Sequence, residues 1–343
     1  MHRRIPLMKR FAMKSLFVNR CLALLVVCAA LLFAWGDVAQ AYPYYAQSNY
    51  DSPREATGKI VCANCHLAAM PTRVEVPQAV TPGQVFDITV EIPYDLSSQQ
   101  VIGDGSKAGL NVGAVVMLPE GFRLATEEEM GPEKWEEISE NYISTYSDEQ
   151  PHILLVGPLP GEDHQELIFP VMAPDPAVDP SISFMKYKVY VGGNRGRGQL
   201  NPDGSLSNNN VFRSPVEGTV LGILEMEDPF SDVPDEFAGT DVGDGYPGTR
   251  LVSFDTAAGP KAMVIPPGPE LLVSTGDNVT EGQDLTVNPN VGGFGQVERD
   301  LVLQSPDRIK WLVAFLGAVL FAQIALVLKK KQVEQIQAAE ILG

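Results

Sequence analysis

Alternating apolar and polar side chains predict β-strands along much of the chain. Residues 86–92 read Phe-Asp-Ile-Thr-Val-Glu-Ile, which has the period of two expected of a half-buried strand. Residues 112–118, 182–191 and 296–303 are predicted as further strands. Pro and Gly punctuate the segments between them. The pattern therefore predicts an all-β sandwich for residues 42–209.

Two helices are predicted within this β-rich region. Residues 127–142, which include Trp135 and Ile138, are interpreted as a short surface helix. Ser52-Pro53-Arg54-Glu55 has the S-x-x-E pattern of a capping box, with Pro at the first helical position. The helix predicted to begin there leads directly into a pair of cysteines.

The first of two long apolar runs lies near the N-terminus, at residues 21–35, after a basic stretch. At fifteen residues it is short for a membrane-spanning helix, and Ala39-Gln40-Ala41 fits a small-residue cleavage site. Residues 1–41 are therefore predicted to be a secretory signal peptide, and the mature chain to begin at Tyr42. An uncleaved membrane anchor is the alternative.

The second apolar run predicts a transmembrane helix at residues 309–328, in which Lys310 is the one charged residue. At about 1.5 Å per residue, twenty residues span about 30 Å, the thickness of the hydrocarbon layer. Three lysines follow at once, at positions 329–331. By the positive-inside rule the tail at 329–343 stays on the side of synthesis, and the large domain lies across the membrane.

Charge is distributed unevenly along the chain. The formal net charge is −18, but residues 42–307 hold 14 Lys and Arg against 40 Asp and Glu, a formal charge of −26. This balance argues against nucleic acid as a partner. It suits an exported domain whose partners are neutral or basic where they dock; solubility alone is the alternative explanation.

The strongest chemical signal is Cys62-Ala63-Asn64-Cys65-His66, the C-x-x-C-H pattern of c-type haem attachment. On a helical turn the second cysteine lies three residues after the first and the histidine four, so all three share one side. Both thiols can then add to the haem vinyl groups while the imidazole binds the iron. A zinc site would need four ligands, and a redox dithiol would not need the histidine.

Residues 210–289 differ in character from the region before them. Residues 216–220 and 270–279 resemble the hairpins of lipoyl- and biotinyl-type domains, although no modifiable lysine stands at an obvious tip. Residues 228–248 are acidic and rich in Gly and Pro, and are predicted to form a mobile loop or insertion. Residues 288–295 then return the chain to the first domain.

Together, these features resemble the cytochrome f family over nearly the whole chain. The segments that carry the resemblance are Tyr42-Pro43, Cys62 to Ala68, Leu110 to Val115, Gly192 to Gln199, Asn288 to Gln296 and the lysine-flanked tail. The acidic insertion departs from the family pattern. The bacterial type of signal peptide favours a cyanobacterial or plastid-encoded origin.

The resemblance implies a mainly β fold. A large lumenal β-sandwich of residues 42–209 would be completed by 290–305, with a small lipoyl-like β-domain inserted at 210–289 and one C-terminal transmembrane helix. It also implies one covalently bound haem c. The chain would be an electron-transfer subunit and not an enzyme, because no bond of a substrate is made or broken on it.

The partners implied by the resemblance are those of photosynthetic electron transport. Electrons would pass from the Rieske iron–sulfur protein to plastocyanin or cytochrome c6. Cytochrome b6, subunit IV and the small subunits of the cytochrome b6f complex would surround the chain in the thylakoid membrane. The C-terminal tail would be stromal or cytoplasmic.

Roles for individual residues follow from the same resemblance. Cys62 and Cys65 would hold the haem covalently, His66 and the α-amino group of Tyr42 would be the axial ligands, and Tyr45 would pack on the haem. Amide side chains, which offer donors and an acceptor without a charge, would line an internal water chain: Asn194, Gln199, Asn209 and Asn290. For Asn209, ordinary turn chemistry is an equal alternative.

Two other classes of protein are alternatives. A haem peroxidase or oxidase would need an open iron position and a distal acid–base residue, but His152 and His164 lie in polar, loop-like sequence. A carrier module would need a modified lysine within residues 210–289.

Overall fold

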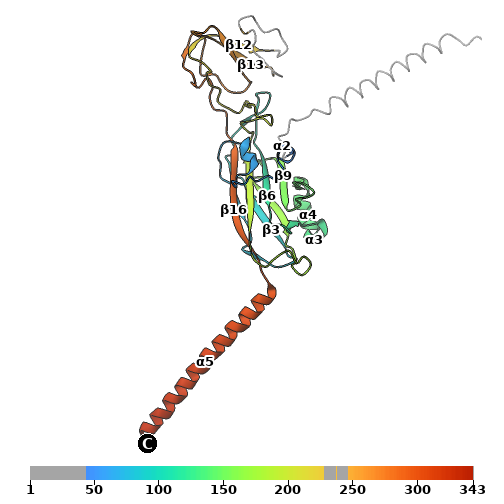
Figure 1. Ribbon diagram of the computed structural model, residues 1–343, viewed down its shortest axis with the longest axis vertical. Helices are drawn as coiled ribbons and strands as arrows, with labels where there is room; N and C mark the ends of the chain where they lie inside the picture. The colour runs from blue at the N-terminus through green and yellow to red at the C-terminus, as the bar shows by residue number, and fades with distance from the viewer. Residues whose placement is uncertain (1–43, 228–236, 238–245, 343) are drawn as a thin grey trace, which may run out of the picture. The chain divides into compact units, whose positions relative to one another are not determined.

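The computed structural model describes residues 44–227, 237 and 246–342, and it confirms the mainly β fold with one long C-terminal helix (Figure 1). The predicted signal peptide, Tyr42 and nearly all of the acidic insertion lie outside these residues.

The first domain is built from two sheets. A six-stranded sheet has the order β2-β16-β11-β6-β9-β8, and a four-stranded sheet has the order β1-β3-β10-β7. Neighbouring strands are antiparallel except β16 and β2, which are parallel. The bounds in the larger sheet are β2 Ala79–Val80, β16 Gly293–Leu303, β11 Lys186–Arg195, β6 Asn111–Met117, β9 Ile153–Pro160 and β8 Ser144–Thr145. Those in the smaller are β1 Arg73–Glu75, β3 Val85–Glu91, β10 Glu166–Met172 and β7 Arg123–Leu124.

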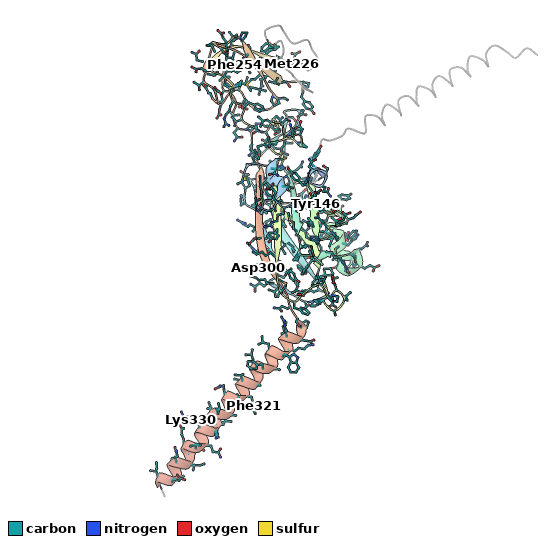
Figure 2. The ribbon with its side chains drawn as sticks, viewed as in Figure 1. Tyr146, Met226, Phe254, Asp300, Phe321 and Lys330 are labelled. Carbon is teal, nitrogen blue, oxygen red and sulfur yellow. The ribbon has the colours of Figure 1, made fainter. Side chains whose placement is uncertain are left out.

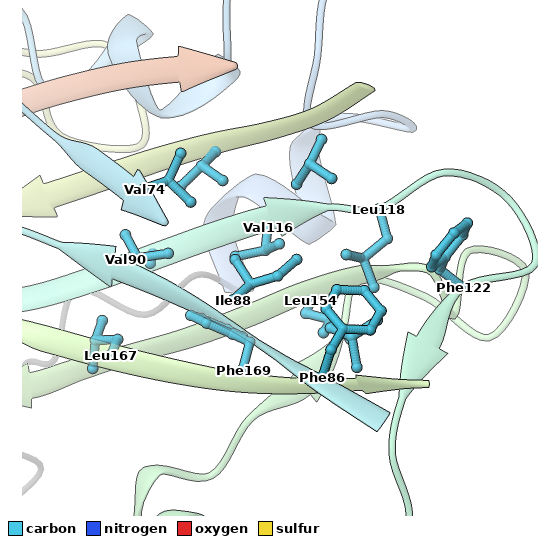
Figure 3. Packing of buried hydrophobic residues seen from close by; sticks show 14 of the residues in the cluster. Val74, Phe86, Ile88, Val90, Val116, Leu118, Phe122, Leu154, Leu167 and Phe169 are labelled. Atoms are coloured by element: carbon cyan, nitrogen blue, oxygen red, sulfur yellow. The ribbon is translucent and has the colours of Figure 1, made fainter. Parts of the chain in front are cut away.

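The two sheets bury the main hydrophobic core between them. The alternation that predicted the strand at 86–92 continues in space, because Ile88 and Val90 of β3 are fully buried while Asp87 is exposed. Phe169 of β10 lies in the same layer, opposite Val116 and Leu154 of the larger sheet (Figure 3).

Three of the predicted boundaries shift. The strand expected at 182–191 begins at Lys186, because Asp179 accepts hydrogen bonds from Ser181 in a turn and Ile182 bonds back to the Asp179 carbonyl. The final strand begins at Gly293, three residues earlier than predicted. The helix expected at 127–142 is split at Gly131, whose φ of 82° lies in the left-handed region. Its pieces are α3 Glu127–Met130, α4 Pro132–Ile138 and η2 Ser139–Asn141.

Residues 210–289 contain a separate antiparallel sheet of order β14-β13-β12-β15. Its strands are β14 Lys261–Ile265, β13 Thr249–Asp255, β12 Gly218–Met226 and β15 Asn278–Val279. Phe254 belongs to one buried cluster, whereas Met226 and Leu251 form another with Phe237. Phe237 comes from the predicted acidic insertion and is only 1% exposed, so its side chain packs on the sheet.

The C-terminal helix α5 runs from Pro306 to Leu342 and is about 56 Å long at 1.5 Å per residue. It extends past the predicted span on both sides. Among the described residues it is the one helix long and apolar enough to cross a membrane. Its apolar side chains, such as Phe321, are exposed (Figure 2), which fits a transmembrane helix.

Candidate functional site

The C-x-x-C-H segment forms a single tight turn, η1 Val61–Asn64. The amides of Cys65 and His66 both donate to the carbonyl of Cys62, at 3.3 and 3.0 Å. Cys62, Cys65 and His66 therefore belong to one turn, as the spacing predicted. The turn is of the 3₁₀ type and is shorter than the predicted helix.

The helix predicted to begin at Ser52 is wrong. Residues 51–60 instead form bends and turns, closed by a bridge between Arg54 and Ile60. The amide of Glu55 donates to the Lys59 carbonyl at 2.9 Å, and Gly58 between them has a φ of 90°. A left-handed glycine five residues after Pro53 favours this turn over continuous helix.

Both thiols of the turn are free. Burial raises the pKa of the Cys62 thiol to about 11 and also raises the pKa of Cys65. Redox-active C-x-x-C pairs work through a thiol whose pKa is lowered, because the thiolate is the nucleophile. The local environment therefore argues against a redox dithiol and leaves two neutral thiols for addition to vinyl groups.

His66 is suited to bind a metal through a neutral imidazole. Burial lowers the pKa of His66 to about 4, so the ring is uncharged at neutral pH. Its Nδ1 atom is buried and has no hydrogen-bond partner within the described part of the chain. Among the described residues, no three His, Cys, Asp or Glu side chains are grouped to hold a metal ion. Two thiols and one neutral imidazole on a single turn fit a haem c.

A second hydrophobic cluster supports the turn on the outer face of the six-stranded sheet. Val115 and Met117 of β6 point into it, whereas Val116 points into the main core. The other buried members are Ile60, Tyr146, Ile153, Leu155 and Phe294, and partly buried Ala46, Cys62, Ala63 and Tyr190 pack against them. The first cysteine of the motif is thus part of a hydrophobic layer.

Glycines let the chain after His66 lie directly on this sheet. Met70 and Phe294 are joined by a backbone hydrogen bond of 3.0 Å, and Phe294 also donates to the Ala68 carbonyl at 2.8 Å. A Cβ atom on Gly295 would come within 2.1 Å of the Met70 carbonyl oxygen. Any larger residue at position 295 would force this segment away from the strand.

Two glutamine side chains hold the ends of the motif segment. Before the motif, Gln296 of β16 accepts from the Ile60 amide and donates to the Gly58 carbonyl, both at 3.0 Å. After it, Gln199 accepts from the Leu67 amide at 2.7 Å. The backbone amide of Gln199 also donates to the Cys65 carbonyl at 2.8 Å. Both glutamines are distant from the motif in sequence, so the turn is fixed by tertiary contacts.

Three of the four residues predicted to line a water chain meet at one point. The Asn290 side-chain oxygen accepts from Gln199 at 2.8 Å and from Asn209 at 2.9 Å. Asn209 also donates to the Arg197 carbonyl at 2.7 Å. Asn194 lies on β11, and its side-chain oxygen is buried without a partner among the described residues. Gln199, Asn209 and Asn290 thus form a cluster of amide side chains that contacts the motif through Gln199. That water occupies this cluster stays a prediction.

Arg195 is a buried charge that the sequence reasoning did not assign. Its side chain is fully buried and donates to the Pro71 carbonyl at 2.7 Å and the Thr72 hydroxyl at 3.0 Å. Burial lowers the pKa of Arg195 to about 10. The glycine-rich stretch around it was the only signal, and nothing in that pattern distinguishes a buried arginine from an exposed one.

Tyr45 lies in the short helix α2, Tyr44–Asn49, which the sequence analysis did not predict. Its side chain is 46% exposed, and its predicted packing against a haem stays a prediction. The neighbouring Ala46 packs on the outer cluster together with Cys62, which brings α2 beside the motif. Tyr42, the predicted second axial ligand, lies outside the described residues.

Comparisons with known proteins agree with this geometry. The chain matches the family models of apocytochrome f, the N-terminal model over residues 42–196 and the C-terminal model over residues 208–342. It is 67% identical to cytochrome f of Synechococcus sp. (strain JA-3-3Ab) over 96% of this chain and 100% of that one. It is 53% identical to cytochrome f of Thermosynechococcus vestitus over 96% and 99%.

Proposed function

This chain belongs to the cytochrome f family, and we propose that it carries single electrons from the Rieske iron–sulfur protein to plastocyanin or cytochrome c6. The observation that supports the proposal most directly is the turn that holds Cys62, Cys65 and a neutral His66 together. A haem bound there supplies a one-electron iron couple.

Four residues are proposed to hold the haem. Cys62 and Cys65 would attach the haem covalently, and His66 and the α-amino group of Tyr42 would bind its iron. If both groups bind the iron, no position on it would be open to a substrate, and the chain would then be an electron carrier and not an enzyme.

The proposed domains and setting follow from the same membership. Residues 42–209 and 290–305 form the lumenal haem-binding domain, and 210–289 form the small β-domain. The chain is a subunit of the cytochrome b6f complex, with cytochrome b6, subunit IV, the Rieske protein and the small subunits as partners. Helix α5 crosses the thylakoid membrane at 309–328, and residues 329–343 lie on the stromal or cytoplasmic side.

Covalent attachment is the test of this proposal. We expect acid–acetone extraction to leave the haem on the purified full-length protein, because thioether bonds survive it whereas a non-covalent haem is removed. Replacement of either Cys62 or Cys65 by Ser should prevent stable assembly. Loss of the haem from the unaltered chain under extraction would refute the proposal, as would binding of cyanide or CO at the rate of an open haem.

The soluble acceptor is proposed to be neutral or basic where it docks, because residues 42–307 have a formal charge of −26. The turn Asp104-Gly105-Ser106-Lys107 holds one lysine and one aspartate, and Asp104 accepts hydrogen bonds from Ser106 within the turn. The docking patch is the apolar surface beside the motif, where Leu67 is 55% exposed, and near Tyr45. Electron-transfer rates that fall steeply with salt for an acidic plastocyanin would contradict this assignment.

A further inference from the structure

The sandwich is joined to helix α5 without a free linker (Figure 1). Two residues separate β16 from the helix. The first, Gln304, donates from its backbone amide to the Val80 carbonyl of β2 at 2.8 Å. The second, Ser305, caps the helix, because its carbonyl accepts from the Ile309 amide at 3.2 Å and its hydroxyl from the Arg308 amide at 3.3 Å. The sandwich therefore continues almost directly into the helix.

This junction keeps one end of the sandwich close to any bilayer that α5 crosses. The predicted span begins at Ile309, about 5 Å along the helix from Pro306 at 1.5 Å per residue. Three peptide steps of about 3.8 Å join Pro306 to Leu303, the last residue of β16, so these two are at most ~11 Å apart. The headgroup layer on each side of the hydrocarbon is about 5–8 Å thick. Loops at this end of the sandwich are therefore within reach of the headgroups.

The loop between β10 and β11, residues 173–185, lies at this end. The carbonyl of its last residue, Met185, accepts from the Leu303 amide at 3.0 Å. In its middle part, the Ile182 side chain belongs to the main core and is 9% exposed. The loop is thus fixed to the end of β16 and to the core, beside the start of α5.

Hydrogen bonds hold the tip of this loop in a defined turn. The amides of Val178 and Asp179 both donate to the Asp175 carbonyl at 2.9 Å. The Asp175 carboxylate accepts from the Ala177 amide at 2.9 Å, and the Asp179 carboxylate accepts from the amide and hydroxyl of Ser181 at 2.9 and 2.6 Å. Because the turn is already formed, a contact made through this tip does not have to order the loop.

The tip and the end of the loop expose apolar side chains. Val178 is 82% exposed and Met185 is 51% exposed, and Ala177 and Pro180 are exposed beside Val178. Single exposed apolar residues are common on soluble surfaces. These differ in lying at the end of the sandwich that continues into a membrane-crossing helix, where Trp311 is 77% exposed and of the type enriched at headgroup level.

We propose that residues 177–180 and Met185 form a shallow contact with the membrane surface, suited to a bilayer of uncharged or zwitterionic headgroups. The headgroup chemistry follows from the charges, since Asp175 and Asp179 flank Val178 and residues 174–185 contain no Lys or Arg. An anionic surface repels such a tip. Hydrogen bonds from the Ser181 hydroxyl and amide lower the pKa of Asp179, so this carboxylate stays charged and limits the depth of the contact.

Such a contact gives the sandwich a second point of attachment beside α5. It goes beyond the proposed electron-transfer function and rests only on the proposed crossing of the membrane by α5. Strand β11 has ten residues and spans ~33 Å at about 3.3 Å per residue. It runs from Met185 to the end of the sandwich where Phe294 of β16 donates to the Ala68 carbonyl. Two attachments at one end therefore hold the C-x-x-C-H turn, at the other end, away from the bilayer.

The test uses spin labels on the full-length protein in phosphatidylcholine vesicles. Val178→Cys places the label on the tip. Leu206→Cys is the matched control, because Leu206 is 55% exposed and bridges Leu200, whose amide donates to the Cys65 carbonyl at the opposite end. Phe321→Cys reports whether α5 lies in the bilayer. The readout is the ratio of collision rates with oxygen, which concentrates in the bilayer, and with a nickel chelate, which stays in water. The unaltered protein, treated in parallel, gives the background from its own cysteines.

We expect the oxygen-to-nickel ratio to be several-fold higher at position 178 than at 206, and lower than at 321. A second pair of variants checks the result from a neighbouring residue. With the label on Met185→Cys, adding Val178→Asp should lower the ratio to that of position 206, whereas adding Leu206→Asp should leave it unchanged. Phosphatidylglycerol mixed into the vesicles should lower the ratio at position 178, because its charge repels the two aspartates.

The outcomes separate this inference from the membrane assignment. If position 321 collides with oxygen but 178 behaves like 206, α5 crosses the bilayer and the contact is refuted. If 321 does not, both are overturned. A label at 178 that becomes protected only after assembly with other subunits would show a protein contact instead. A ratio at 178 that rises with phosphatidylglycerol would overturn the assigned headgroup chemistry.

Discussion

The two faces of the six-stranded sheet perform different tasks with the same strands. On the inner face, Val116 and Leu154 meet the second sheet in a layer of apolar side chains. On the outer face, Val115 and Leu155 form a smaller cluster under the C-x-x-C-H turn, the proposed haem site. The inner face is closed mainly by apolar packing, whereas the turn on the outer face also depends on hydrogen bonds from distant residues. The inner face therefore contributes most to the stability of the domain, and the outer face positions the C-x-x-C-H turn.

The largest effect should come from opening the inner face. Phe169→Ala removes a side chain that is fully buried between the sheets and should lower the free energy of unfolding by ~3–5 kcal/mol. The haem spectrum of the molecules that remain folded should not change. Denaturant titration followed by absorbance measures both, with Val178→Ala, 82% exposed, as the control. A decrease in the free energy of unfolding of less than ~1 kcal/mol would mean that packing between the two sheets is not the main source of stability.

The outer face should respond to a polar change that would be minor elsewhere. Gln296→Leu leaves the Ile60 amide without its acceptor and should cost ~1–3 kcal/mol, with a lower yield of attached haem. Gln84→Leu is the matched control, since Gln84 accepts from the Thr81 amide at 3.0 Å in a turn away from the motif. Equal haem yields in the two variants would remove the distinction between the faces.

The same comparison explains what could be predicted from sequence. The inner face leaves a local record, because alternation at 86–92 is visible within seven residues and β3 follows it. The C-x-x-C-H turn is also local. The anchors are not, since Gln296 is 236 residues from Ile60. No pattern near either residue marks its partner.

The helix predicted to begin at Ser52 shows that a local signal can also mislead. The sequence has the capping-box pattern, but the segment forms a turn. This turn is stabilised by the bridge between Arg54 and Ile60 and by the hydrogen bond from the Ile60 amide to Gln296. Tertiary contacts outweigh a local propensity of this size. The cluster of amide side chains formed by Gln199, Asn209 and Asn290 was predicted only from the family resemblance. Asn and Gly residues in this pattern are equally typical of a loop.

The amide side chains predicted to line a water chain allow their role in electron transfer to be tested separately from their role in stability. Asn194 has a buried oxygen without a partner among the described residues, so Asn194→Leu should change the free energy of unfolding by less than ~1 kcal/mol. Gln199→Leu loses bonds to Leu67 and Asn290 and should cost ~1–3 kcal/mol. If the group holds a water chain, flash-induced haem re-reduction should slow in both variants with the spectrum unchanged. Normal re-reduction in both would leave these side chains a structural role only.

The smallest effect should come from a charge on the surface of the sandwich, far from any role in the outer face. Glu129 of α3 accepts from both guanidinium nitrogens of Arg123, at 2.7 and 2.8 Å, and from the Thr126 amide at 2.8 Å. The hydrogen bonds from Arg123, and then the one from Thr126, lower the pKa of Glu129 to about 2. Because the folded pKa is depressed, the stabilisation is complete above the ordinary value near 4.5 and is lost as the pH falls toward 2.

Glu129→Gln should therefore cost ~0.5–1 kcal/mol at pH 7, a size typical of an exposed ion pair that also caps a helix. The cost should shrink between pH 4.5 and pH 2, as the carboxyl of the unaltered protein becomes protonated. Glu128→Gln is the control, since Glu128 lies in the same turn and is exposed. Unfolding curves at several pH values, read together with the haem spectrum, measure the difference. A change in the haem spectrum of Glu129→Gln would show that this surface, beside β7 of the smaller sheet, is coupled to the C-x-x-C-H turn. None of the hydrogen bonds described for Glu129 leads to that turn.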